Sequence, residues 1–165
     1  MSNLPSVSHE LHRPDCSDWA GLILEIPERQ IVNKMESLQA RLPRLQQCGA
    51  SIAINNFGRG SLSFEAISQM PFSEIKIDRS LVEGCGTVAT NANICKTIIQ
   101  IAHNFGCRAA AVGVSTSADL QLLTQLGCDT GQGFLLGKPM TALQLDALVA
   151  GFLSQADKRP EVRAS

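Results

Sequence analysis

Residues 94–112 read ICKTIIQIAHNFGCRAAAV, and this stretch holds the unit that decides the fold. Its isoleucines recur at helical spacing and predict an amphipathic helix over residues 91–105. Gly106 follows directly, and glycine readily adopts the left-handed conformation that ends helices. The small residues 107–112 are typical of a strand buried on both faces. The stretch therefore predicts a helix, a tight turn and a buried strand.

The same unit occurs twice more, because Cys48-Gly49 and Leu126-Gly127 also join an expected helix to an expected strand. Alternating strands and helices predict an α/β domain with a parallel sheet and right-handed crossovers. Pro43 should kink or split the first long helix. The expected strands are residues 21–26, 51–54, 73–77, 107–112 and 130–134. The expected helices are residues 31–45, 61–70, 91–105, 116–126 and 141–153.

Composition limits the class of protein. The chain has 165 residues, of which 44% are hydrophobic and 18% charged, as in one globular domain. We expect this domain over residues 20–155, an N-terminal arm over 1–19 and a mobile C-terminal tail over 156–165. The 14 Lys and Arg residues balance 15 Asp and Glu residues, so no basic field attracts nucleic acid or an anionic membrane. The N-terminus has no apolar segment of signal-peptide length, and the cytoplasm is the expected location.

The cysteines do not form a standard zinc motif. There is no Cys-x-x-Cys pair, and the chain has only three histidines. We expect the cysteines to be free thiols in the core. They are Cys16, Cys48, Cys85, Cys95, Cys107 and Cys128.

Candidate functional residues follow from the predicted topology. In open and closed parallel sheets, ligands bind at the carboxyl ends of the strands. Six residues lie at or near those ends, and they include one carboxylate, one ammonium group and three amides. They are Glu25, Asn55, Asn56, Lys76, Val112 and Gln132.

Several phrases around these residues resemble the EAL family, the bacterial cyclic di-GMP phosphodiesterase domains. The resemblance covers roughly residues 20–148, and five separated phrases agree with the family in order and spacing. They are LEIPE at 24–28, INNFGRG at 54–60, IKIDRS at 75–80, AVGVS at 111–115, and QGF at 132–134 with Lys138-Pro139.

The resemblance implies a modified TIM-type barrel that hydrolyses cyclic di-GMP with two divalent cations. In the implied site, Glu25 matches a metal-binding glutamate, Lys76 a lysine that handles the attacking water, and Gln132 a glutamine of the same pocket. The family's upstream part, with its Glu-Ala-Leu signature and a metal-binding Asn, has no counterpart here. We therefore expect a partial barrel of about five strands with helices outside, lacking the N-terminal part.

The departures from the family remove charge. Asn55-Asn56 stand where the family has two aspartates, and Val112 and Ser115 stand where it has two glutamates. A pair of divalent cations needs several carboxylates to offset the repulsion between the ions. Glu25 alone remains, and we expect it to pair with Lys76 instead of a metal. The sequence thus predicts no metal cofactor and no hydrolysis.

Purely structural interpretations of the same residues remain open. Glu25 and Lys76 form an ordinary ion pair in one reading, and the asparagine pair is then only a strand-to-turn element. His103, near the end of a helix, is expected to serve the helix dipole or solvent.

Chain length predicts an interaction role. A TIM barrel needs about 250 residues, so five strands cannot close alone. The open segment should expose its strand edges beside apolar interior side chains. We therefore expect a homodimer or docking on another signalling protein.

Three functions follow from the sequence. The first is a catalytically inactive EAL-like regulatory or protein-interaction module in cyclic di-GMP signalling. The second is a receptor that binds cyclic di-GMP weakly without cutting it, with Arg59, Arg79, Lys138 and Pro139 as candidate contacts. The third is a phosphodiesterase completed by a partner chain.

Overall fold

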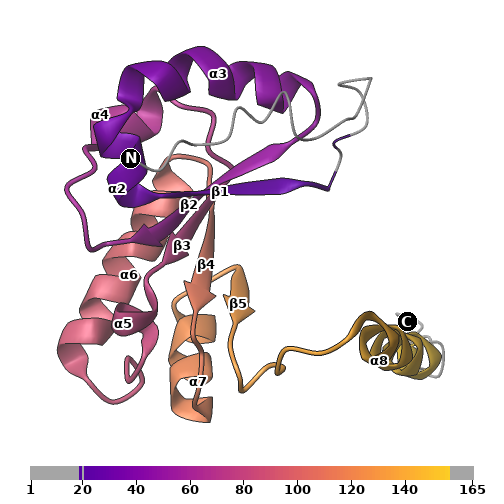
Figure 1. Ribbon diagram of the computed structural model, residues 1–165. Coiled ribbons are helices and arrows are strands. Elements are labelled where there is room, and N and C mark those ends of the chain that lie inside the picture. Colours follow the sequence, from indigo (N-terminus) through magenta and orange to yellow (C-terminus); the bar gives the residue numbers. More distant parts are fainter. Residues whose placement is uncertain (1–18, 20, 157–165) are drawn as a thin grey trace, which may run out of the picture.

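Five parallel strands form one sheet in the order in which they occur in the chain. The strands are β1 (Ile23–Pro27), β2 (Ser51–Phe57), β3 (Glu74–Ile77), β4 (Arg108–Val112) and β5 (Thr130–Gln132). When parallel strands follow one another in order, right-handed crossovers place their helices on the same face, as in a TIM barrel. The predicted five-stranded α/β architecture is confirmed (Figure 1).

The computed structural model describes Trp19 and residues 21–156, and side chains as far as Gly151. Apart from Trp19 and Ala156, the predicted arm and tail lie outside the described residues. Trp19 is buried, and its backbone N–H donates to Cys48 O at 3.2 Å.

Seven helices are described alongside the sheet. They are α2 (Glu28–Asn33), α3 (Met35–Gln47), α4 (Phe64–Ser68), α5 (Arg79–Val82), α6 (Ala89–Asn104), α7 (Ser117–Gln125) and α8 (Ala142–Ala156). The predicted glycine turns are confirmed, since Gly49, Gly106 and Gly127 have φ of 91°, 69° and 78°. Within residues 21–156, no helix is long and apolar enough to cross a membrane.

The first helical segment is broken at a different residue from the one predicted. Pro43 lies inside α3, which is not split there, and the break between α2 and α3 falls at Lys34. Pro43 is exposed, so water can satisfy the carbonyl whose helical hydrogen bond the proline removes.

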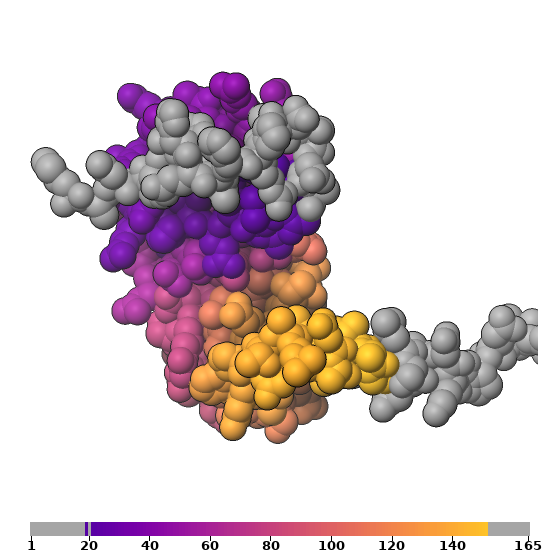
Figure 2. Space-filling view, turned by 45° about the vertical axis from the view of Figure 1, so that its right-hand side comes forward, coloured from indigo at the N-terminus to yellow at the C-terminus, as the bar shows by residue number. Residues whose placement is uncertain are grey.

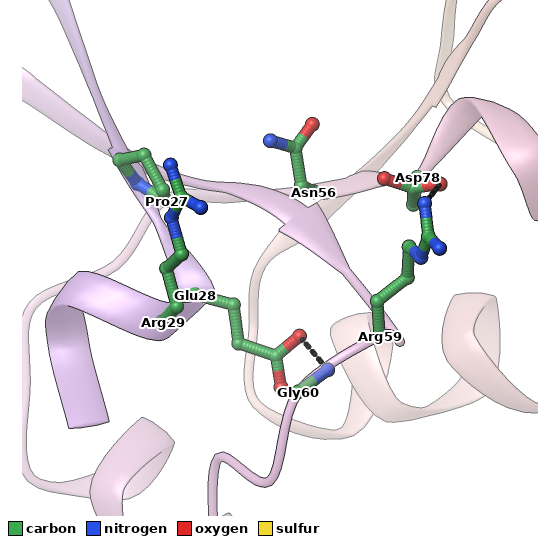
Figure 3. Close-up of a pocket in the computed structure, with 7 residues that line it drawn as sticks. All are labelled: Pro27, Glu28, Arg29, Asn56, Arg59, Gly60 and Asp78. Atoms are coloured by element: carbon green, nitrogen blue, oxygen red, sulfur yellow. Dashed lines mark hydrogen bonds and ion pairs between the residues drawn. The ribbon is translucent and has the colours of Figure 1, made fainter.

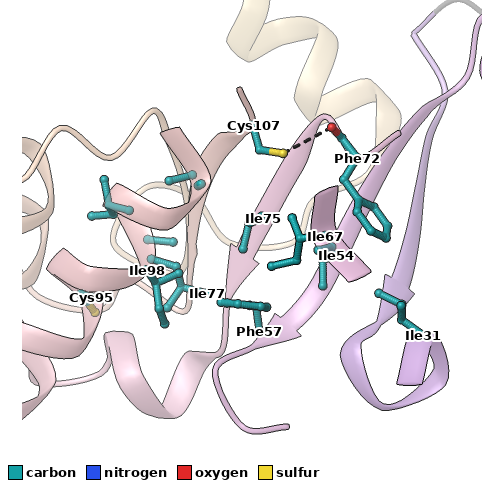
Figure 4. Close-up of a cluster of buried hydrophobic side chains, with 14 of the residues drawn as sticks. Ile31, Ile54, Phe57, Ile67, Phe72, Ile75, Ile77, Cys95, Ile98 and Cys107 are labelled. Atoms are coloured by element: carbon teal, nitrogen blue, oxygen red, sulfur yellow. Dashed lines mark hydrogen bonds between the residues drawn. The ribbon is translucent and has the colours of Figure 1, made fainter. Parts of the chain in front are cut away.

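The core fills the space between one sheet face and the helices (Figure 4). Ile52, Ile54, Ile75 and Ile77 are fully buried on this face. They pack in one cluster with residues of α3, α4, α6 and α7. Full burial of such a side chain contributes about 1.5–3 kcal/mol, so this cluster holds the strands and helices together.

The opposite sheet face carries mainly small and polar side chains, with Ile23 and Val112 as apolar exceptions. Strand residues alternate between faces, and the residues next to the core isoleucines on the opposite face are Ala53, Asn55, Glu74 and Lys76. Near the amino end of the strands, Arg108 Nη2 lies 3.2 Å from Glu74 Oε2. Most apolar strand positions point to the helices, and at the β1 edge the exposed Ile23 keeps an apolar side chain on the open side, as the sequence led us to expect.

The cysteines agree with the sequence prediction where it can be checked. Cys85, Cys95, Cys107 and Cys128 are free thiols, and the first three are buried. Cys48 is buried as well. Cys16 lies outside the described residues.

Candidate functional site

Four predicted site residues form a continuous row across the carboxyl ends of the strands. We call Glu25, Asn55, Lys76 and Gln132 the central row. Lys76 Nζ forms an ion pair with Glu25 Oε1. Asn55 Nδ2 donates to Glu25 Oε2 at 3.0 Å, and Lys76 Nζ donates to Gln132 Oε1 at 3.5 Å. The sheet thus joins residues that are up to 107 positions apart in the sequence.

The Glu25–Lys76 pairing predicted from the sequence is present. The Lys76 side chain is only 11% exposed, whereas that of Glu25 is 40% exposed. An ammonium group with so little access to water needs a nearby anion or hydrogen-bond acceptors. Glu25 supplies the anion, and Gln132 supplies an acceptor. Both carboxylate oxygens of Glu25 are already engaged within the row.

Asn55 and Asn56 occupy different environments. The reason is a bulge in β2 between Ile54 and Phe57, where the register with β3 shifts. Ile54 pairs with Ile75 and Phe57 pairs with Ile77, so β2 has one more residue than β3 in this interval. Asn56 takes the left-handed conformation, with φ of 56°. Asparagine tolerates this conformation better than most residues. Asn55 therefore joins the central row, whereas Asn56 lies at the neighbouring pocket described below.

The remaining departures from the EAL pattern add no charged group to the row. Val112 is in register with Gln132 and contributes an aliphatic side chain. Ser115 is exposed beyond the end of β4.

The candidate cyclic di-GMP contacts are spread over three segments. Arg59 Nη1 lies 3.8 Å from Asp78 Oδ1, and Arg79 Nε lies 3.6 Å from Glu83 Oε2. Lys138 and Pro139 are exposed after β5. In the described part of the chain, no hydrogen bond or ion pair links these last two residues to the arginines.

Glu28 is a buried carboxylate to which the sequence analysis gave no role. It is 4% exposed and accepts backbone N–H groups from Gly58 at 3.1 Å, Gly60 at 2.9 Å and Leu62 at 3.1 Å. A Cβ at Gly60 would lie 2.6 Å from Glu28 Cδ, so a side chain there would displace the carboxylate. The only sequence signal was an acidic residue directly after the first strand, and its partners are 30 to 34 residues away.

A pocket of about 300 Å³ lies beside the central row, at the same edge of the sheet. We call it the rim pocket. Its lining residues come from the ends of β1 and β2, the start of α2, the loop after β2 and the residue that follows β3 (Figure 3). They are Pro27, Glu28, Arg29, Asn56, Arg59, Gly60 and Asp78.

The sequence is similar to known signalling proteins. It is 37% identical over 129 residues to the bifunctional diguanylate cyclase/cyclic di-GMP phosphodiesterase MucR of Pseudomonas aeruginosa, covering 78% of this chain and 19% of MucR. It is 29% identical to the cyclic di-GMP phosphodiesterase RocR of the same species, covering 84% of this chain and 34% of RocR. The chain therefore spans about a fifth to a third of these relatives.

Solved structures show the same fold. A complex of the Pseudomonas aeruginosa MucR phosphodiesterase with c-di-GMP matches with a TM-score of 0.72 and 36% identity, covering 75% of this chain and 50% of that one. The EAL domain of Mycobacterium smegmatis DcpA matches with a TM-score of 0.73 and 33% identity, covering 78% of this chain and 58% of that one. Residues 5–139 also match the sequence model of the EAL domain family. The chain belongs to the EAL domain family.

Proposed function

We propose that this chain is a catalytically inactive EAL module that acts by protein interaction in cytoplasmic cyclic di-GMP signalling. The observation that carries the proposal is the environment of Glu25. One carboxylate oxygen pairs with Lys76 and the other accepts from Asn55. The single acidic group of the central row is thereby neutralised within the protein.

The other residues of the site fit a pair of divalent cations poorly. Asn55 Oδ1 accepts the backbone N–H of Asn56 at 2.9 Å, and Val112 has no donor atom. In the part of the chain that the structure describes, no group of three or more His, Cys, Asp or Glu side chains is arranged to hold a metal ion. Mg²⁺ prefers an oxygen octahedron with one or two carboxylates. We therefore assign no metal and no metal-dependent step to this chain.

The test of inactivity is an assay of cyclic di-GMP hydrolysis with Mg²⁺ or Mn²⁺, with the MucR phosphodiesterase domain as positive control. We expect no linear product from this chain. The triple variant Asn55→Asp, Asn56→Asp, Val112→Glu should also be inactive, because five strands supply only part of the barrel. Metal-dependent turnover by the unmodified chain would refute the proposal, and turnover by the triple variant would refute the argument from the incomplete barrel.

A phosphodiesterase completed by a partner chain is the alternative that retains catalysis. A partner can supply missing strands, but it cannot change Asn55, Asn56 or Val112. Turnover that appears only when the remaining strands of an EAL barrel are added in trans would favour this alternative over the inactive module.

Exposed apolar side chains support the interaction role. They gather in the segment after β5 and on α8, which lies away from the sheet in Figure 1 and whose yellow residues lie at the front of the lower part of the molecule in Figure 2. Apolar patches of this kind mark protein-interaction surfaces. We propose that they contact a second copy or another signalling protein. The residues are Phe134, Leu135, Leu136, Met140, Leu143, Leu145, Leu148 and Val149.

A receptor that binds cyclic di-GMP without hydrolysis is a second candidate. Two similar proteins, the MucR phosphodiesterase and the FimX EAL domain of Pseudomonas aeruginosa, have been solved with c-di-GMP bound. Of the candidate contacts in this chain, Arg59 follows β2, Arg79 begins α5 after β3, and Lys138 and Pro139 follow β5. Calorimetric titration with cyclic di-GMP separates the receptor from the interaction module. A binding heat that saturates in the micromolar range favours the receptor. If no binding heat is measured, the receptor candidate is rejected.

A further inference from the structure

The Glu28 carboxylate anchors the backbone beside two arginines that line the rim pocket. Arg29 follows Glu28 directly at the start of α2. Arg59 lies between Gly58 and Gly60, and both of these residues donate their backbone N–H groups to Glu28 Oε2. The two backbone segments that carry the arginines are therefore tied to the same buried carboxylate.

The side chains that face the rim pocket are rich in unused hydrogen-bond donors. Within the described residues, neither the Arg29 guanidinium nor the Asn56 amide has a hydrogen-bond or ion-pair partner. Arg59 has only the 3.8 Å contact with Asp78, and its side chain is 66% exposed. In Figure 3, Asn56 lies between Arg29 on one side and Arg59 with Asp78 on the other.

The two acidic residues of the lining are largely engaged by donors of the protein. Glu28 accepts three backbone N–H groups. Asp78 Oδ1 accepts the backbone N–H of Ser80 at 2.9 Å and the Ser80 hydroxyl at 2.6 Å. Both carboxylates keep their charge, but the Glu28 carboxylate and Asp78 Oδ1 already accept hydrogen bonds from the protein, whereas the Arg29 guanidinium and the Asn56 amide have no partner within the described residues.

The conformation of Asn56 adds an independent observation. Asparagine tolerates the left-handed region better than most residues, and non-glycine residues held there cluster at ligand sites. Here the left-handed turn and the β2 bulge take Asn56 out of the central row and place it in the lining of the rim pocket.

We propose that the rim pocket binds a phosphomonoester group through Arg29, Asn56 and Arg59. Guanidinium groups bind phosphate oxygens through paired, charge-assisted hydrogen bonds. Two guanidinium groups match the two negative charges of a phosphomonoester better than the single negative charge of a phosphodiester. The volume of about 300 Å³ suits a small ligand such as inorganic phosphate or a mononucleotide. The proposal uses no residue of the central row and does not depend on the proposed function.

The proposal is tested by NMR titration of the ¹⁵N-labelled full chain with inorganic phosphate and, separately, with adenosine 5′-monophosphate at constant ionic strength. We expect saturable shifts of the amides of Asn56, Gly58 and Gly60. Arg29→Gln and Arg59→Gln should each weaken binding about tenfold, the effect of losing one charge-assisted contact. Tighter binding of the nucleotide would identify a nucleotide site, and equal binding would identify a site for the phosphate group alone.

Arg41→Gln is the matched control, because Arg41 is exposed on α3 and does not line the pocket. This variant should bind phosphate as the unmodified chain does. The proposal is overturned if neither probe shifts these amides, or if Arg41→Gln weakens binding as much as Arg29→Gln. Binding of cyclic di-GMP without binding of either probe would also overturn it, while leaving the receptor candidate in place.

Discussion

At the scale of single residues, Glu28 shows how a buried charge organises a loop. Its carboxylate accepts three backbone N–H groups from the loop that follows β2. A buried carboxylate is costly unless hydrogen bonds compensate the loss of water. The loop donors supply that compensation, and in return they are held in a fixed position beside the central row.

Glu28→Gln should reduce the free energy of unfolding by about 2–3 kcal/mol, because hydrogen bonds to a charged group are worth about 1.5–3 kcal/mol and the amide keeps only part of them. Urea denaturation followed by circular dichroism measures this change. Glu36→Gln, an exposed residue on α3, is the control and should change stability by less than about 0.5 kcal/mol. Equal stability of the two variants would contradict the anchoring role of Glu28.

At the scale of elements, the N-terminus of α7 is tied to the segment after α5. Thr116 Oγ1 accepts the backbone N–H of Asp119 at 3.1 Å, as the predicted cap requires. Asp119 is 1% exposed, and its carboxylate accepts the Thr116 hydroxyl at 2.6 Å and the Gly86 N–H at 2.9 Å. Burial raises the pKa of Asp119, but the hydrogen bonds from Thr116 and Gly86 outweigh it and hold the pKa below its ordinary value.

This arrangement predicts a pH-dependent stability. A depressed folded-state pKa stabilises the protein above the ordinary value of 3.8, and the contribution is lost as the pH falls through the folded-state value. Asp119→Asn should therefore be less stable than the unmodified chain at neutral pH, and the difference should shrink as the pH is lowered below 3.8. Urea midpoints of both proteins across this range provide the measurement, and a difference that stays constant with pH would contradict the prediction.

Two cysteines, Cys85 after α5 and Cys95 within α6, are predicted to be unreactive in the folded protein. Burial, with the nearby Asp119 carboxylate, raises the pKa of Cys85 to about 11. Burial, with the neighbouring Cys85, raises the pKa of Cys95 to about 12. The thiolate is the nucleophile, so iodoacetamide at neutral pH should label both residues only after denaturation in urea. Mass spectrometry of digested protein checks this, and rapid labelling of either residue in the native chain would disprove it.

At the scale of the whole molecule, the sheet is open and its last helix has an exposed apolar surface. Leu145 and Leu148 on α8 are 49% and 45% exposed. Strands β1 and β5 are the edges of the sheet, each paired on one side only within the described residues. Unpaired edges and apolar surface both favour association with other chains.

Light scattering is expected to show self-association at micromolar concentration. The double variant Leu145→Asp, Leu148→Asp should shift the mass toward the 17.7 kDa monomer, because charges at these positions oppose burial in an interface. Val32→Asp provides the control, since Val32 is 40% exposed on α2, outside the segment after β5. A monomer at all concentrations for the unmodified chain would refute self-association, and docking on a different protein would remain to be tested by direct binding.

The sequence by itself determined the architecture and most of the central row. The alternation of helix and strand patterns, the three glycine turns and the apolar strands are local features, and local features fix secondary structure. The carboxyl ends of parallel strands meet at one edge of the sheet, so Glu25 and Lys76 were both expected there, and their pairing was expected from the resemblance to the EAL family.

Only the tertiary structure decided which groups Glu28 contacts, where Asn56 lies, and which sheet face is left uncovered by helices. The three partners of Glu28 lie 30 to 34 residues away, and the role of Asn56 depends on a bulge in the pairing of β2 with β3. Neither feature leaves a periodic signal, because each depends on strand register and on the path of a loop. The side of each strand that faces the helices was likewise settled only by packing, since the sequence pattern shows which residues alternate but not what covers them.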